Sequence, residues 1–261
     1  MDDTRRRRLA AVTQSLLFAL LVAVTGCSST QPTTTAEPTS SPEAGACLRS
    51  DGGCLGVLSP GEYESEFFTT FGEPSPGQLA YEVGDDYWAN ALDHTPSYWL
   101  QPAEQYAAGS GDEILPGVYV WGDVAPAAQE FPSCPEEADP SGPTDAAGMA
   151  AWMSALGGIT STPVADATID GRPAVALDLV LDPATSPRCS WGPFVPLVAA
   201  RAGASDPYMW GIGSGERMQL YLVDVGDGHT AAVIIDAPTA EFDALVPHAR
   251  ALIATFEFAA G

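Results

Sequence analysis

Apolar side chains recur at helical spacing in a stretch of the chain's second half. They follow one another at i, i+3, i+4 and i+7, and so share one helical face: Met149, Trp152, Met153 and Leu156. Thr144 precedes them as a candidate N-cap, Asp145 lies where the helix dipole favours a carboxylate, and residues 157–158 are glycines, which commonly end helices. This pattern predicts one amphipathic helix.

A second helix is predicted over residues 240–253, with Thr239 as its candidate N-cap. Its apolar face carries Phe242, Leu245, Val246, Ala249, Leu252 and Ile253. Pro247 lies inside this stretch. Because proline lacks a backbone N–H and collides with the preceding turn, we expect a kink or a division into two turns.

Strand patterns cover most of the remaining chain. Short aromatic-rich runs broken by glycine and proline, together with one apolar run, occur at residues 67–71, 79–83, 98–100, 118–121 and 194–200. Asp170 and Gly171 favour a hairpin between their flanking runs. Residues 226–228 favour a second one, whose apolar return run, residues 231–235, we expect to be a central strand.

These elements predict an α+β fold for residues 47–261, which we interpret as a single domain. An antiparallel sheet of hairpin-linked strands would pack with two main helices, because the regular strand–helix alternation of a doubly wound sheet is missing. A chain of 261 residues retains enough length for one sizeable core after residues 1–46 are set aside.

The first residues have the features of an export signal. Arginines occupy positions 5–8, an apolar run covers residues 16–24, and a small residue, Gly26, precedes Cys27. The apolar run is about half as long as the roughly 20 residues that a membrane-spanning helix needs. Cleavage is therefore the better interpretation than a permanent span.

Residues 24–27 resemble the lipobox of bacterial lipoproteins, whose cysteine is acylated and becomes the first mature residue. The resemblance implies a lipoprotein signal peptide over residues 1–26 and an acyl anchor, such as palmitate, on Cys27. Two acyl chains suffice for stable anchoring. The alternatives are an uncleaved anchor, or ordinary cleavage that leaves a free thiol.

Residues 27–46 are rich in Ser, Thr and Pro and carry no large apolar side chain. Such a segment buries too little surface to offset the entropy of ordering, so we expect a disordered tether. An O-glycosylated stalk fits the same composition.

The charge balance excludes one class of partner. The formal net charge is -24, and the 10 basic residues are all arginine. Such a negative surface repels the phosphate backbone of nucleic acids, which argues against nucleic-acid binding. It also repels anionic lipids, so membrane attachment requires an anchor. An acidic surface keeps an exported protein soluble; a cation-binding role is the alternative.

Four cysteines follow Cys27: Cys47, Cys54, Cys134 and Cys189. An even number in an exported chain indicates two disulfides, with three possible pairings. We expect Cys47 to pair with Cys54 across a short turn, which leaves Cys134 for Cys189. A metal site is the competing interpretation, but no histidine lies at ligand spacing, so we expect neither a metal nor another cofactor.

The most individual stretch of the body is residues 85–94, in which aromatic and acidic residues precede His94. A speculative ligand cleft is assigned to Tyr87, Trp88, His94 and Trp99. The alternative is that these rings plug the end of a sheet. A Ser-His-Asp triad through His94 is an alternative, but any exposed loop offers such neighbours. Residues 211–215 miss the glycine that a nucleophile elbow requires, so the catalytic residues are unknown.

Several short motifs, taken together, resemble a family of uncharacterised actinobacterial secreted proteins and lipoproteins. They lie at residues 61–65, 87–90 and 97–102, and Cys134, Asp170-Gly171 and residues 217–222 follow in the same order. The family's order of elements is similar to that of PsbP-like α+β domains, which mostly serve as accessory modules. Tyr87 departs from the family's pattern, which has a Gly-Trp pair at this corner.

These observations predict an accessory or binding module, lipid-anchored at the outer face of the cytoplasmic membrane, that engages an envelope protein or a small ligand. The alternative is an extracytoplasmic hydrolase that works from a cleft near Trp88 and His94. The pattern of residues does not decide the oligomeric state.

Overall fold

The computed structural model describes residues 49–50, 53–65, 68, 78–109, 115–165, 167–201 and 208–258. The chain divides into two compact units, Met1–Ser41 and Pro42–Gly261, and all described residues belong to the second. The predicted signal peptide and tether therefore lie outside the described residues.

The predicted α+β class is wrong, because the described part of the chain is mostly β, with 50% strand and 17% helix. Several antiparallel sheets and three helices make up this part of the chain. The sequence predicts too few strands, because several of them are short or contain glycine and proline. Glycine and proline are depleted in strands, and runs that contain them therefore indicate loops as much as strands.

The largest sheet has nine strands, and we call it the central sheet. Its path runs through β10 (Ile159–Pro163), β12 (Arg172–Leu181), β16 (Glu216–Gly226), β17 (His229–Pro238), β8 (Gly117–Trp121), β7 (Ser97–Pro102), β6 (Trp88–His94) and β3 (Gly56–Val57), and β11 (Ala167–Ile169) also pairs with β12. All its pairings are antiparallel.

Both predicted hairpins are confirmed. Asp170 and Gly171 connect β11 to β12 with φ angles of 54° and 66°, the left-handed values that a tight two-residue turn requires. Residues 226–228 connect β16 to β17. β17 pairs with β16 on one side and β8 on the other, so it is central as expected.

Three smaller sheets complete the β structure. One contains β4 (Gly61–Glu64), β5 (Leu79–Val83) and β18 (Glu257–Phe258). Another contains β9 (Val124–Pro126), β13 (Arg188–Cys189), β14 (Gly192–Ala200) and β15 (Met209–Gly213). The third pairs β1 (Arg49–Ser50) with β2 (Gly53–Cys54).

The helices are α1 (Ala103–Ala108), α2 (Ala146–Ser154) and α3 (Thr239–Ile253). The N-cap of α2 is Asp145, one residue later than predicted, and its carboxylate accepts a hydrogen bond from Gly148 N at 2.8 Å. α3 is a single element that contains Pro247, so it does not divide in two. In the described part of the chain, no helix has the length and apolar character to cross a membrane.

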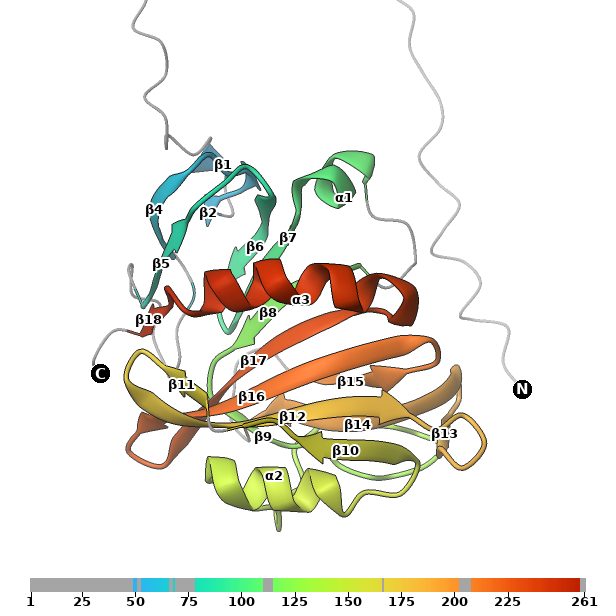
Figure 1. Cartoon of the computed structure of the whole chain (residues 1–261). Helices are drawn as coiled ribbons and strands as arrows, with labels where there is room; N and C mark the ends of the chain where they lie inside the picture. Colours follow the sequence, from blue (N-terminus) through green and yellow to red (C-terminus); the bar gives the residue numbers. More distant parts are fainter. Residues whose placement is uncertain are drawn as a thin grey trace, which may run out of the picture. The chain divides into compact units, whose positions relative to one another are not determined.

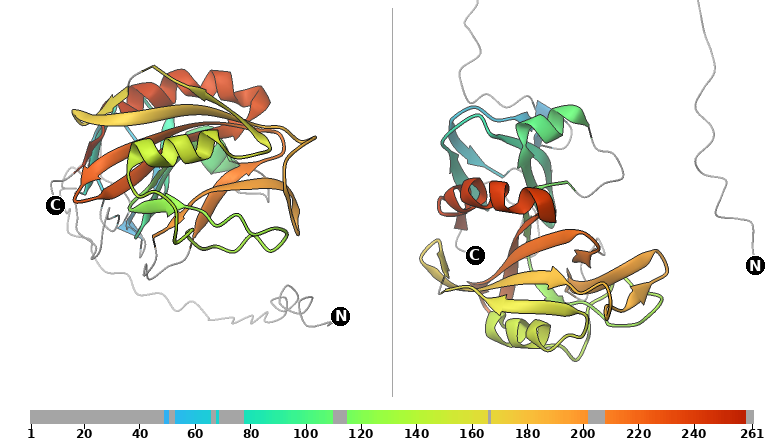
Figure 2. Two further views of the ribbon diagram at one scale, coloured as in Figure 1. Left: turned by 90° about the horizontal axis from the view of Figure 1, so that it is seen from below. Right: turned by 45° about the vertical axis from the view of Figure 1, so that its right-hand side comes forward.

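The central sheet is buried on both faces, with α3 on one face and α2 on the other (Figures 1 and 2). The α3 face packs Tyr221, Val223, Val233 and Ile235 against Phe242 and Leu245. The opposite face packs Leu220, Leu222 and Ile234 against Met149, Met153, Val195 and Ile212. Because successive side chains of a strand point to opposite faces, β16 and β17 contribute to both cores.

Candidate functional site

A pocket of about 320 Å³ opens between the α2 face of the central sheet and strand β15. Its lining residues are Trp99, Gln101, Leu115, Tyr119, Phe194, Met209, Trp210, Gly211, Glu216 and Asp236, and we call it the aromatic–carboxyl pocket. Small-molecule sites typically enclose roughly 300–1,000 Å³. The pocket therefore suits a compact ligand.

The strand register brings two carboxyl groups to this pocket. β16 and β17 pair so that Met218 lies opposite Asp236 and Glu216 lies opposite Pro238. Side chains two residues apart share a face of a strand, so Glu216 and Asp236 are diagonal neighbours on the same face.

Asp236 is 2% exposed, and its Oδ1 has no hydrogen-bond partner among the described residues. Burial, reinforced by repulsion from Glu216, raises the pKa of Asp236 well above its ordinary value. The indole N–H of Trp210 acts in the opposite direction, but it does not reach hydrogen-bonding geometry with the carboxyl. The Asp236 carboxyl is thus desolvated without full compensation.

Glu216 is half-buried and accepts a hydrogen bond from Gly213 N at 2.5 Å. Burial raises the pKa of Glu216, and this hydrogen bond offsets part of the shift. The pocket therefore holds two acids whose charged forms are both disfavoured.

Aromatic rings form the walls around these acids. The centroids of Tyr119 and Trp210 lie 4.6 Å apart, and Trp99 meets Tyr119 edge-on at 5.4 Å. Trp121 and Tyr208 extend the cluster, stacked at 4.2 Å. Rings packed against one another lose little freedom when a ligand binds, so this wall is preorganised.

The titratable side chains of the lining are Tyr119, Glu216 and Asp236. Among the described residues that line the pocket, none is Ser, Thr, Cys, His, Lys or Arg, so the pocket offers no nucleophile–base pair built from those side chains.

Two other pockets are weaker candidates for a ligand site. One, of about 520 Å³, is lined by Asp85, Asp86, Glu104 and Glu241, all of which are exposed. Exposed carboxylates keep their hydration and do not require a ligand. No group of three or more His, Cys, Asp or Glu side chains within the described ranges could hold a metal ion.

The third pocket, of about 280 Å³, lies beside α3 and is lined partly by Trp88 and His248. The ring of His248 stacks on Tyr87 with centroids 3.9 Å apart and planes inclined by 4°. This contact attaches the segment before β6 to α3.

The four residues of the predicted cleft do not come together. Trp88 is buried in the core on the α3 face, and Tyr87 packs against that core. Trp99 lies on the opposite face and lines the aromatic–carboxyl pocket. His94 is exposed at the end of β6 and lines none of the three pockets.

The predicted bond between Cys134 and Cys189 is confirmed, with Cα atoms 5.7 Å apart. It connects the loop after β9 to β13. The predicted partner pair Cys47 and Cys54 lies outside the residues whose side chains the structure describes, as does Cys27, for which acylation is predicted.

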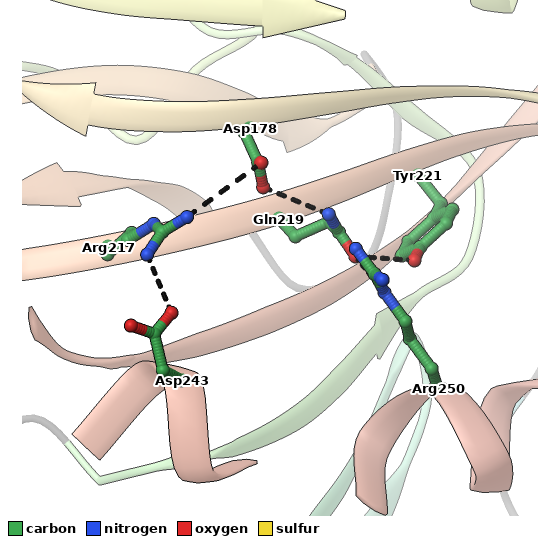
Figure 3. A network of polar contacts seen from close by, with 6 residues as sticks. All are labelled: Asp178, Arg217, Gln219, Tyr221, Asp243 and Arg250. Carbon is green, nitrogen blue, oxygen red and sulfur yellow. Dashed lines mark hydrogen bonds and ion pairs between the residues drawn. The ribbon is translucent and has the colours of Figure 1, made fainter. Parts of the chain in front are cut away.

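A polar network on the α3 face contains Asp178, Arg217, Gln219, Tyr221, Asp243 and Arg250 (Figure 3). Gln219 Nε2 donates to Asp178 Oδ1 at 2.9 Å, and Gln219 Oε1 accepts from Tyr221 at 2.6 Å and from Arg250 Nε at 3.0 Å. Arg217 donates to Asp243 of α3 at 2.8 Å. Because its members pair with one another, we interpret the network as structural.

His229 lies in a second paired group. Its Nδ1 is 2.8 Å from Asp123 Oδ1, and Arg201 Nε lies 2.8 Å from the same oxygen. Arg201 also donates to the Gly228 carbonyl at 2.8 Å. The group attaches the turn between β16 and β17 to the turn between β8 and β9.

Sequence reasoning missed Glu216, Asp236 and Trp210. A signal for Asp236 exists, since this acid follows an apolar run of β17 directly. Glu216 has no comparable signal, because its proximity to Asp236 depends on the register of two strands.

No protein-family model matches the chain, and no curated protein matches it either. The resemblance to secreted actinobacterial proteins therefore stays a prediction. The function has to be argued from the pocket itself.

Proposed function

We propose that this protein is a lipid-anchored extracytoplasmic binding module whose aromatic–carboxyl pocket takes a compact small molecule. The observation that carries the proposal is the desolvated carboxyl of Asp236 beside a wall of packed aromatic rings. A buried acid without a full set of partners destabilises the empty fold, so its presence in a pocket favours a binding role.

The pocket proposal is tested with the full chain and a panel of small neutral and charged compounds. Binding raises the melting temperature, because a ligand that binds only the folded state stabilises it. In the variant Leu115→Trp, a larger ring fills the pocket from its rim and should abolish the shift. The matched control Val57→Trp adds the same ring at a position that is 58% exposed and should leave the shift intact.

Two results would contradict this part of the proposal. One is a panel in which no compound shifts the melting temperature of the wild type. The other is a ligand that shifts the wild type and the Leu115→Trp variant equally, since that ligand binds elsewhere.

The anchoring proposal is supported by the arginine run, the short apolar run and Cys27 in the order of a lipoprotein signal. The acidic body cannot attract an anionic bilayer, so the anchor supplies the attachment. We expect Cys27→Ser to release the protein from the membrane fraction and to abolish incorporation of labelled palmitate. A Cys27→Ser variant that stays with membranes as a processed protein would refute the anchor.

The hydrolase alternative has no comparable support. Its best candidate, His94, is exposed and lines none of the three pockets described above. We therefore expect His94→Ala to fold normally and to bind the ligands of the wild type.

A further inference from the structure

The aromatic–carboxyl pocket is lined by two acids without a basic partner. Glu216 and Asp236 both line it, and no described lining residue carries a positive charge. Asp236 Oδ1 is buried without a hydrogen-bond partner in the described part of the chain. A positive ligand in this pocket would lower the raised pKa values of both carboxyls and so favour their charged forms.

The rings that surround these acids favour the same sign of ligand. The faces of Trp and Tyr rings are negative, and cations bind over them within about 6 Å of the centroid. Trp99, Tyr119 and Trp210 all line the pocket. Carboxylates and ring faces therefore both attract a positive ligand, and both repel an anion.

The rest of the chain strengthens this preference. A formal net charge of -24 creates a negative potential that concentrates cations near the surface. The apolar walls disfavour a bare, strongly hydrated metal ion, because its water would have to be removed without a set of oxygen ligands to replace it. An organic cation carries its own apolar cover and avoids this cost.

We propose that the aromatic–carboxyl pocket binds a compact organic ammonium ion, with Glu216 and Asp236 as its counter-charges and Trp99, Tyr119 and Trp210 as the faces that contact it. The inference rests on the proposed function, because it names the ligand class of the same pocket.

Choline is the probe, and 3,3-dimethyl-1-butanol is its neutral isostere, in which carbon replaces the charged nitrogen. Titration calorimetry on the full chain at neutral pH should give at least about tenfold tighter binding of choline than of the isostere. Asp236→Asn and Glu216→Gln keep the shape of the pocket and should each remove most of this preference. Asp243→Asn, which removes one charge at an exposed position on α3, is the matched control and should retain it.

The outcomes distinguish the preference for an ammonium ion from the presence of a small-molecule pocket. Equal binding of choline and the isostere would overturn the ammonium inference and leave the small-molecule pocket standing. A preference for choline that survives in both carboxyl variants would overturn the assigned counter-charges. Failure of both compounds at millimolar concentration would overturn the inference, and the panel described above then decides whether the pocket binds another class of ligand.

Discussion

Replacing Asp236 by Asn should make the protein more stable at neutral pH, with a difference that depends on pH in a defined direction. Asp236 is 2% exposed and lies beside Glu216, and its pKa in the fold is raised well above the ordinary value of 3.8. Asparagine has nearly the same shape and does not ionise. The variant therefore removes a desolvation cost without opening a cavity.

The sign follows from proton linkage. Below pH 3.8 the Asp236 carboxyl is protonated in both the folded and the unfolded states, and its stabilising contribution is fully present. As the pH rises from 3.8 towards the raised pKa, unfolding releases a proton, so the free energy of unfolding falls by about 1.4 kcal/mol per pH unit. The loss is complete once the pH has passed the raised pKa.

Urea unfolding followed by tryptophan fluorescence, from about pH 4 to about pH 8, measures this difference. The advantage of Asp236→Asn over wild type should grow by about 1.4 kcal/mol per unit in the affected interval. Asp139→Asn is the control that should show no such trend, because hydrogen bonds from Ser141 lower the pKa of Asp139 below 3.8, so its contribution changes only below the measured interval. Parallel curves for wild type and Asp236→Asn would refute the reasoning.

Three further predictions concern the fold. Removing the disulfide with the double substitution Cys134→Ser and Cys189→Ser should lower the free energy of unfolding by about 4 kcal/mol, because the bond closes a loop with a sequence separation of 55. Reduction of this bond in the wild type should have the same effect. Tyr98→Phe should lower the free energy of unfolding, measured by urea denaturation, by about 1–3 kcal/mol. The lost hydroxyl forms hydrogen bonds with the buried side chains of Tyr81 and Asn90 at 2.8 and 2.9 Å. Gly117→Ala should lower the melting temperature, because the added Cβ would lie 2.7 Å from a backbone oxygen of β7. In the control Gly84→Ala the added Cβ meets open space, so the melting temperature should change little.

The parts of the fold that depend on short stretches of sequence could be predicted. The buried residues Met149 and Met153 mark α2 because their spacing is that of one helical face. Asp170 and Gly171 mark the first hairpin because few residues adopt their φ angles without strain. Both signals come from the chemistry of neighbouring residues.

Pairings between distant segments could not be predicted in the same way. β15 contains Gly211 and Gly213, so its sequence indicates a loop as much as a strand. Tertiary packing decides its state, because β15 contributes Ile212 to the core on the α2 face. The number of strands, and with it the fold class, was underestimated for this reason.

The candidate site also depends on contacts between distant segments. The sequence singles out Trp99, but its partners in the pocket come from strands far along the chain, such as Trp210 on β15. Glu216 and Asp236 meet only because β16 and β17 adopt one register. A shift of one residue would turn Asp236 towards the other face of the sheet.

The pairing of β18 with β5 closes a contact between distant parts of the chain. Phe258 lies opposite Leu79, so this small sheet is complete only when two segments 179 residues apart (258 − 79) come together. Such a contact slows folding, because the entropy of closing a long loop has to be overcome before the contact stabilises the structure.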